Sequence, residues 1–269
     1  MGRANGDATP DRRFDKAVRG LADRTTLWRA FGDWTEAAAL ALANAFPGRG
    51  LDPRWDDREA RYLGIAKRYD PGLWSSATAE MMACVVDGLG EDEPADFLGS
   101  AFMRLELSSH WHGQFFTPME VSLCMARMLV SEGPLRESVE GRGFVTLMEP
   151  ACGAGGMVVA FSTAMREAGL NPQRQLHVTA QDIDPTAVHM AQVQLSLLGI
   201  PAVIHLGNTL TQERSETWRT PQHWLGMWDA RIRRSLDDGE DAAPDVVQVP
   251  GGARPAIGRT SQLELFRKA

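Results

Sequence analysis

The sequence of 269 residues contains no long apolar run and only three cysteines. A membrane-spanning helix needs roughly 18 or more consecutive apolar residues, so no transmembrane span is predicted. The polar segment 1–7 lacks the apolar centre of a secretory signal. Cys84, Cys124 and Cys152 lie far apart, which argues against a disulfide framework and against a zinc knuckle. We therefore expect a cytoplasmic protein with no membrane partner.

Positive charge is also scarce. The chain has 28 basic and 35 acidic residues, which gives a formal net charge of −7. A protein that holds DNA alone by its phosphates is usually basic. Contact with DNA is therefore expected to be local, shared with a partner, or absent.

The first part of the chain has a helical pattern. Residues 1–14 are polar and charged and are expected to form a flexible arm. From Thr26 to about Leu107, apolar residues recur at steps of three to four, between proline and glycine breaks. This predicts an all-helical N-terminal domain over residues 15–112. Large aromatics are usually buried, so we interpret its tryptophans as core anchors rather than base-stacking platforms: Trp28, Trp34, Trp55 and Trp74.

From Thr117 onward, helical and strand patterns alternate. Thr117-Pro118 is a helix cap followed by a first-turn proline, and it predicts a helix over Met119–Val130. Further on, we expect strands over 144–148, 176–181 and 202–206, joined by helices over 157–168 and 185–198. Such alternation implies a parallel, Rossmann-like sheet with right-handed crossovers. Residues 113–210 therefore form the predicted α/β core.

The remainder of the chain is polar. Residues 211–236 are rich in tryptophan, and a helix is expected from about Pro221 to Leu236. The composition of residues 237–269 is typical of a flexible tail.

A glycine-rich turn lies between the first predicted strand and the helix after it: Glu149-Pro150-Ala151-Cys152-Gly153-Ala154-Gly155-Gly156. This geometry lets a ligand approach bare backbone at a helix N-terminus. Such turns also occur for packing alone, so the turn by itself does not establish a ligand site.

Two further motifs accompany the turn: Gly113-Gln114-Phe115-Phe116-Thr117-Pro118 before it and Gln181-Asp182-Ile183-Asp184-Pro185 after it. The ordered set resembles the N6-adenine DNA methyltransferases, above all the modification subunits of type I restriction systems and their phage or mobile-element relatives. The similarity runs from about Asp96 to Leu210. It implies a class I methyltransferase sheet, S-adenosyl-L-methionine as cofactor, DNA as substrate and a bacterial or phage-encoded protein.

The resemblance assigns cofactor contacts to the glycine turn. Gly153 and Gly155 would admit the methionine end of the cofactor against backbone amides, and Ala151 lies in the same turn. Glu149 would face the α-ammonium group. Asp182 ends the second strand, where an acid can accept hydrogen bonds from both ribose hydroxyls.

Other residues would complete the cofactor pocket. Ile183 would lie on the adenine ring. Asn208 stands where the family usually has an acid that reads the adenine amine, and its amide can still engage that edge. Phe116, Thr117 and Pro118 match a family motif that closes over the methionine moiety.

The group that would grip the target base is missing. Adenine methylases flip the base out of the duplex, and the family holds it with an Asn/Asp-Pro-Pro-aromatic tetrad after the fourth strand. The sequence contains no such tetrad. Asp245 and Asn208 are the only candidates for accepting a hydrogen bond from the amine. The segment 244–252 is either a decayed fourth strand or a linker.

Without a fourth strand, the first strand would be an open edge of the sheet. Three covers are conceivable: residues 245–249, a partner chain, or the tryptophan-rich segment with Trp218, Trp224 and Trp228.

Histidines do not predict a metal site. His110 and His112 flank Trp111, but no third ligand accompanies them, so a surface role is favoured.

Two main functions remain open. The first is a DNA adenine-N6 methyltransferase homologue that binds S-adenosylmethionine and needs a partner, such as a second methylase or a specificity subunit. The second is a catalytically inactive scaffold or regulatory subunit with a methylase fold. Methylation of another substrate is a third reading, which the missing tetrad permits.

Near the end of the chain, Gln262-Leu263-Glu264-Leu265-Phe266 resembles the short peptide by which bacterial replication and repair proteins dock on the DNA sliding clamp. It stands after a Gly/Pro-rich tether, and its apolar side chains would fill subsites of the clamp. The alternative is a terminal turn folded back on the protein's own core.

Overall fold

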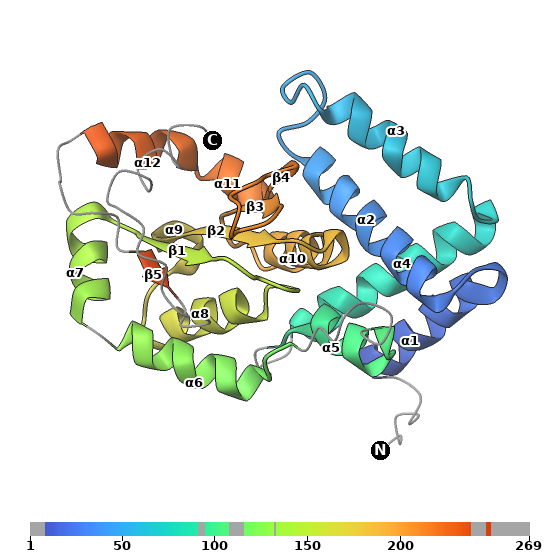
Figure 1. Ribbon diagram of the computed structural model, residues 1–269, viewed down its shortest axis with the longest axis horizontal. Coiled ribbons are helices and arrows are strands. Elements are labelled where there is room, and N and C mark those ends of the chain that lie inside the picture. Colours follow the sequence, from blue (N-terminus) through green and yellow to red (C-terminus); the bar gives the residue numbers. More distant parts are fainter. Residues whose placement is uncertain (1–8, 91–94, 108–115, 132, 238–245, 249–269) are drawn as a thin grey trace, which may run out of the picture.

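The computed structural model describes residues 9–90, 95–107, 116–131, 133–237 and 246–248. A helical region comes first and an α/β region comes second, and the two pack side by side (Figure 1). None of the described helices is long and apolar enough to cross a membrane.

The described helices of the first region are α1 (Pro10–Leu21), the 3₁₀ helix η1 (Ala22–Arg24), α2 (Leu27–Ala45), α3 (Trp55–Ala66), α4 (Pro71–Leu89) and α5 (Phe97–Arg104). Their core is aromatic: the Phe14 ring meets Trp34 and Phe97 edge-on at centroid distances of 5.3 and 5.4 Å. Trp34 and Trp74 are buried, as expected of core anchors, whereas Trp28 and Trp55 are half-buried.

The prediction of a flexible arm over residues 1–14 is wrong from Pro10 onward. Thr9 and Pro10 begin α1, and Phe14 is fully buried. The mostly polar sequence of α1 hides a narrow apolar stripe of Phe14, Val18 and Leu21, which packs against the helical core.

The α/β region contains a five-stranded sheet in the order β4-β3-β2-β1-β5. Its strands are β1 (Val145–Glu149), β2 (Leu176–Asp182), β3 (Ala202–Leu206), β4 (Glu216–Arg219) and β5 (Val246–Gln248). All neighbours pair in parallel except β3 and β4. This confirms the Rossmann-like α/β class. Antiparallel β4 was not predicted because its four residues carry little apolar alternation.

Helices cover both faces of the sheet. The connecting helices are α8 (Gly156–Glu167), α9 (Pro172–Gln175) and α10 (Pro185–Leu197), and α6 (Met119–Val130) packs on α8. α7 (Gly133–Arg142) leads into β1, and α10 lies between the sheet and α2 (Figure 1). α11 (Pro221–Leu225) and α12 (Trp228–Asp237) cover part of the opposite face, where Trp228 contacts His177 of β2 and Phe144.

The tryptophan-rich segment differs from the single helix expected there. It contains β4 and two helices, which are broken at Gly226-Met227, where Met227 has φ 49°. Trp218 and Trp228 are buried in the fold. They therefore do not cover the edge of β1.

The edge of β1 is covered by β5. Val246, Val247 and Gln248 pair in parallel with residues 146–148 of β1. The sequence predicted either a decayed fourth strand or a linker over residues 244–252. Residues 246–248 form a strand beside β1, so the linker prediction is wrong for these three residues. Asp245 and the segment 249–269, including the predicted clamp-binding peptide, lie outside the described residues.

The helical region seals the other edge of the sheet. Arg54 donates a hydrogen bond to the Thr217 carbonyl of β4 at 2.6 Å. Arg61 pairs with Glu216 at 2.5 Å and lies over the Trp218 ring. These contacts occupy an edge strand that would otherwise present unpaired backbone groups.

Candidate functional site

The glycine turn connects β1 to α8 with two residues in the left-handed region. Gly153 has φ 53° and Gly155 has φ 93°. The Cys152 amide donates to the Gln181 carbonyl at 2.9 Å, which ties the turn to the end of β2. Gly155 caps α8 without any side-chain hydrogen bond. The first amides of a long helix are therefore directed towards the site without a side-chain cap.

Asp182 lies beside this turn, as its motif predicts. Its Oδ2 accepts a hydrogen bond from the Gly153 amide at 2.8 Å, and its Oδ1 accepts from the Asp184 amide at 2.9 Å. A carboxylate offers about four acceptor positions. The two backbone bonds fix the orientation of Asp182 and leave acceptor capacity for a ligand.

Glu149 is the most perturbed acid of the site. It is 8% exposed, and its Oε1 accepts from the Ala151 amide at 3.2 Å. Burial, with a smaller contribution from the nearby charge of Asp182, raises the pKa of Glu149 to about 7. Burial also raises the pKa of Asp182.

Neither Glu149 nor Asp182 has an ion-pair partner among the residues that the structure describes. Glu149 is buried and Asp182 is half-buried. Two such acids without a counter-charge favour a cationic ligand, because a cation would offset the cost of ionising them.

Phe116 contacts the turn at Gly153. A Cβ atom on Gly153 would lie 2.6 Å from the Phe116 ring, so only glycine allows this approach. Phe116 also packs on Phe102 of α5, with ring centroids 5.7 Å apart. Thr117 and Pro118 are exposed beside it, and residues 113–115 of the same motif lie outside the described part of the chain. The structure therefore brings Phe116 and the glycine turn together.

The rim of the site is formed by the loop after β3 and by Ile183. Ile183 is 66% exposed, so its side chain is open to a ligand. Asn208 uses its Oδ1 to accept from the Leu210 amide at 2.9 Å, which leaves its NH₂ group for contact with a ligand. Thr209 was not predicted, and its Oγ1 donates to the Pro150 carbonyl at 2.6 Å. That bond holds the loop against the glycine turn.

Two further residues escaped the sequence reasoning. Asp96 and Gln194 are buried beneath the turn, and Gln194 Nε2 donates to both Asp96 Oδ1 and the Ala154 carbonyl at 2.8 Å. Asp96 had a local signal, because an aspartate immediately before an apolar helical segment is typical of an N-cap. Gln194 had none, since it lies within a mostly buried helix.

No group of three or more potential metal ligands occurs in the described ranges. His110 and His112 are outside those ranges, as is Asp245, one of the two candidates for accepting the target amine.

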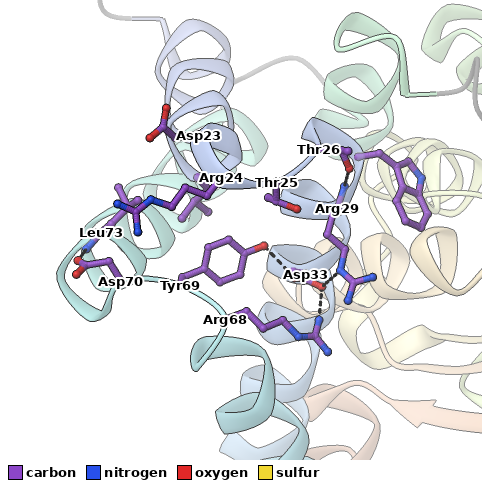
Figure 2. Close-up of a pocket in the computed structure, with 12 residues that line it drawn as sticks. Asp23, Arg24, Thr25, Thr26, Arg29, Asp33, Arg68, Tyr69, Asp70 and Leu73 are labelled. Carbon is purple, nitrogen blue, oxygen red and sulfur yellow. Dashed lines mark hydrogen bonds and ion pairs between the residues drawn. The ribbon is translucent and has the colours of Figure 1, made fainter.

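A separate groove of about 740 Å³ lies in the helical region. Figure 2 shows Tyr69 and Arg68 directed towards Asp33, which accepts hydrogen bonds from Arg68 at 2.7 Å and from the Tyr69 hydroxyl at 2.9 Å. Arg29 pairs with the same carboxylate at 3.3 Å. The charged residues that line the groove balance: Arg24, Arg29 and Arg68 against Asp23, Asp33 and Asp70. These bonds join α2 to the connection before α4, so the polar residues of the groove have a structural role.

The family of the chain is indicated by its α/β region. Residues 101–229 match the family model described as N-6 DNA Methylase. This stretch, a little under half of the chain, is similar to the N-6 DNA methylases. The matched stretch includes Phe116, the glycine turn, Asp182 and Asn208. None of the curated proteins matches the chain.

Two solved structures are similar to this methylase homologue. One is a Listeria monocytogenes protein described as a class I S-adenosylmethionine-dependent methyltransferase, with a TM-score of 0.41 and 11% identity over 75% of this chain and 53% of that one. The other is the type I restriction-modification system methyltransferase subunit of Streptococcus thermophilus, with a TM-score of 0.37 and 14% identity over 76% of this chain and 59% of that one. The chain spans little more than half the length of either protein.

Proposed function

We propose that this chain binds S-adenosylmethionine at the glycine turn and acts in adenine-N6 methylation of DNA together with a partner. The observation that carries the proposal is the pair of acids, buried Glu149 and half-buried Asp182, beside the uncapped N-terminus of α8. S-adenosylmethionine combines a cationic ammonium and sulfonium with a carboxylate and a ribose diol. An acid-lined turn at a helix N-terminus suits that combination.

Each residue has a distinct part in this proposal. Asp182 accepts from the ribose hydroxyls, Glu149 pairs with the α-ammonium group, and Ile183 lies on the adenine ring. Asn208 reads the edge of the adenine through its amide. Phe116 and the neighbouring Thr117-Pro118 cover the methionine moiety, and Gly153, Gly155 and Ala151 supply the backbone of the turn.

Calorimetric titration with S-adenosylmethionine tests the cofactor assignment. Asp182→Ala should weaken binding about 10- to 150-fold, which corresponds to about 1.5–3 kcal/mol for hydrogen bonds to a charged group. Asp184→Ala is the matched control, since Asp184 is adjacent in sequence but caps α10 through the Thr186 amide. Equal binding by wild type and Asp182→Ala would remove the case for this site.

The missing tetrad favours a second candidate function. A methylase fold that binds the cofactor but lacks the Asn/Asp-Pro-Pro-aromatic grip can serve as a scaffold or regulatory subunit. A catalytic partner or specificity subunit would then supply the base-flipping and DNA-reading groups. Co-purification with a methylase and restoration of methyl transfer by that second chain would distinguish the assisted enzyme from the inactive scaffold.

We also propose that Gln262-Leu263-Glu264-Leu265-Phe266 docks on a bacterial sliding clamp. A tether raises the effective concentration of an acidic protein near DNA without phosphate contacts. A fluorescence-polarisation titration of the peptide against a clamp tests this, and binding that survives Leu265→Ala with Phe266→Ala would contradict it.

A further inference from the structure

A buried carboxylate lies directly beneath the glycine turn. Asp96 is 9% exposed and caps α5, with its Oδ1 accepting from the Gly99 amide at 2.9 Å. The same oxygen accepts from Gln194 Nε2 at 2.8 Å. Burial raises the pKa of Asp96, and the hydrogen bonds from Gln194 and from the Gly99 amide oppose that shift.

Gln194 links three separate elements through one amide group. Its Nε2 donates to the Ala154 carbonyl at 2.8 Å as well as to Asp96, and its Oε1 accepts from the Leu98 amide at 3.0 Å. Gln194 itself is fully buried on α10. The helical region, α10 and the glycine turn are therefore joined at a single side chain.

Two glycines make room for the Asp96 carboxyl group. A Cβ atom on Gly156 would lie 2.7 Å from Asp96 Oδ2, and the three atoms nearest to it all belong to Asp96. A Cβ atom on Gly99 would collide with the same carboxyl group. The group cannot turn away freely, because the Gly99 amide and Gln194 both hold its other oxygen.

We propose that Asp96 and Gln194 are positioning residues that fix the glycine turn for the cofactor. Position 156 is then a glycine because a side chain there would collide with the Asp96 carboxyl group, and not because the cofactor needs the space. Gln194 holds the Ala154 carbonyl, which lies between Gly153 and Gly155. Because those two glycines carry the left-handed conformation of the turn, fixing the carbonyl between them fixes the amides that face the ligand. The consequence for cofactor binding rests on the proposed function.

A thermal double-mutant cycle tests the role of Gly156 without any cofactor. In the wild-type background, Gly156→Ala places a methyl group against the held carboxyl group and should lower Tm. Asp96→Ser removes the carboxyl group but keeps a hydroxyl cap for the Gly99 amide. In that background, Gly156→Ala should raise Tm by on the order of 2 °C, because alanine favours a helix over glycine. The same effect of Gly156→Ala in both backgrounds would overturn the assignment.

Calorimetry with S-adenosylmethionine tests the positioning role. Asp96→Ser and Gln194→Leu should each weaken binding at least about tenfold, measured well below Tm. Asp52→Ser is the matched control, since Asp52 is a similarly buried acid, paired with Arg58 far from the turn. It should lower Tm and leave the Kd unchanged.

Wild-type affinity in Asp96→Ser and Gln194→Leu would overturn the positioning role. If the wild-type protein binds no S-adenosylmethionine, the proposed function fails and the positioning role of Asp96 and Gln194 fails with it. The thermal double-mutant cycle still tests the contact between Asp96 and Gly156, because it needs no cofactor.

Discussion

At the scale of single residues, the site is defined by a buried acid and a half-buried acid that have no ion-pair partner in the described part of the chain. Glu149 and Asp182 stand at the carboxyl ends of adjacent parallel strands, where ligands of open α/β sheets bind. The motifs predicted both residues. They could not predict the raised pKa of Glu149, because burial depends on the tertiary structure.

The pKa of Glu149 predicts how the stability of the free protein depends on pH. The folded protein keeps this proton up to about pH 7, whereas the unfolded chain releases it near the ordinary glutamate pKa of 4.5. The folded state therefore loses stability as pH rises from about 4.5 to 7, by on the order of 3 kcal/mol. Glu149→Gln should remove this loss in thermal unfolding measured from pH 4 to 8.

The control for that experiment is Glu120→Gln, which alters an exposed glutamate on α6. Its unfolding profile should match the wild type, and a Glu149→Gln profile that also matches the wild type would refute the prediction. Cofactor binding should show the opposite pH dependence. Because ionised Glu149 attracts the ammonium group, the affinity for S-adenosylmethionine should increase about tenfold between pH 6 and 8.

Contacts between residues far apart in the chain could not be predicted from the sequence. Gly153, Gly155 and Asp182 belong to local motifs, and the structure brings them together. Asp96 lies against Gly156 and is joined to the Ala154 carbonyl through Gln194, which lies 98 positions further along the chain. Neither local sequence predicts that contact.

At the scale of elements, sequence periodicity located the regular structure well. The predicted helix Met119–Val130 and strand 202–206 have the bounds of α6 and β3. Proline boundaries at Pro118 and Pro201 explain this agreement. The expected cap by Thr117 is wrong, because Pro118 is itself the N-cap of α6 and no side chain caps the helix. β4 and the break between α11 and α12 were missed because both depend on tertiary contacts: β4 on pairing with β3, and the break on the packing of Trp228.

The short strand β5 has a testable role at the edge of the sheet. A chain ending at Asp237 lacks β5 and exposes the backbone groups of β1 that pair with residues 246–248. We expect this chain to have a lower Tm and to self-associate, because an open strand edge templates pairing with other chains. Thermal unfolding and sedimentation velocity measure the two effects.

A chain ending at Gln248 is the control, since it keeps β5 and removes only residues 249–269. It should retain the Tm and the oligomeric state of the full chain. The same behaviour from both truncated chains would show that β5 does not protect the edge of β1.

At the scale of the whole molecule, the helical region supports the sheet from two sides. Its α2 packs against α10, and Arg54 and Arg61 seal β4. Through Asp96 and Phe102 it also reaches the glycine turn and the ring of Phe116. The two regions therefore share one candidate cofactor site, although the sequence predicted them as separate domains.

The isolated chain should transfer little or no methyl group to DNA. The base-gripping tetrad is absent from the sequence, and positioned acceptors of this kind supply a large part of the catalytic effect in such sites. The acidic net charge of −7 further weakens unaided contact with DNA phosphates. Transfer of labelled methyl groups to unmethylated DNA, with a known adenine methylase as positive control, measures this activity. Substantial N6-methyladenine formation would contradict the prediction, and Asp245→Ala and Asn208→Ala would then identify the acceptor of the target amine.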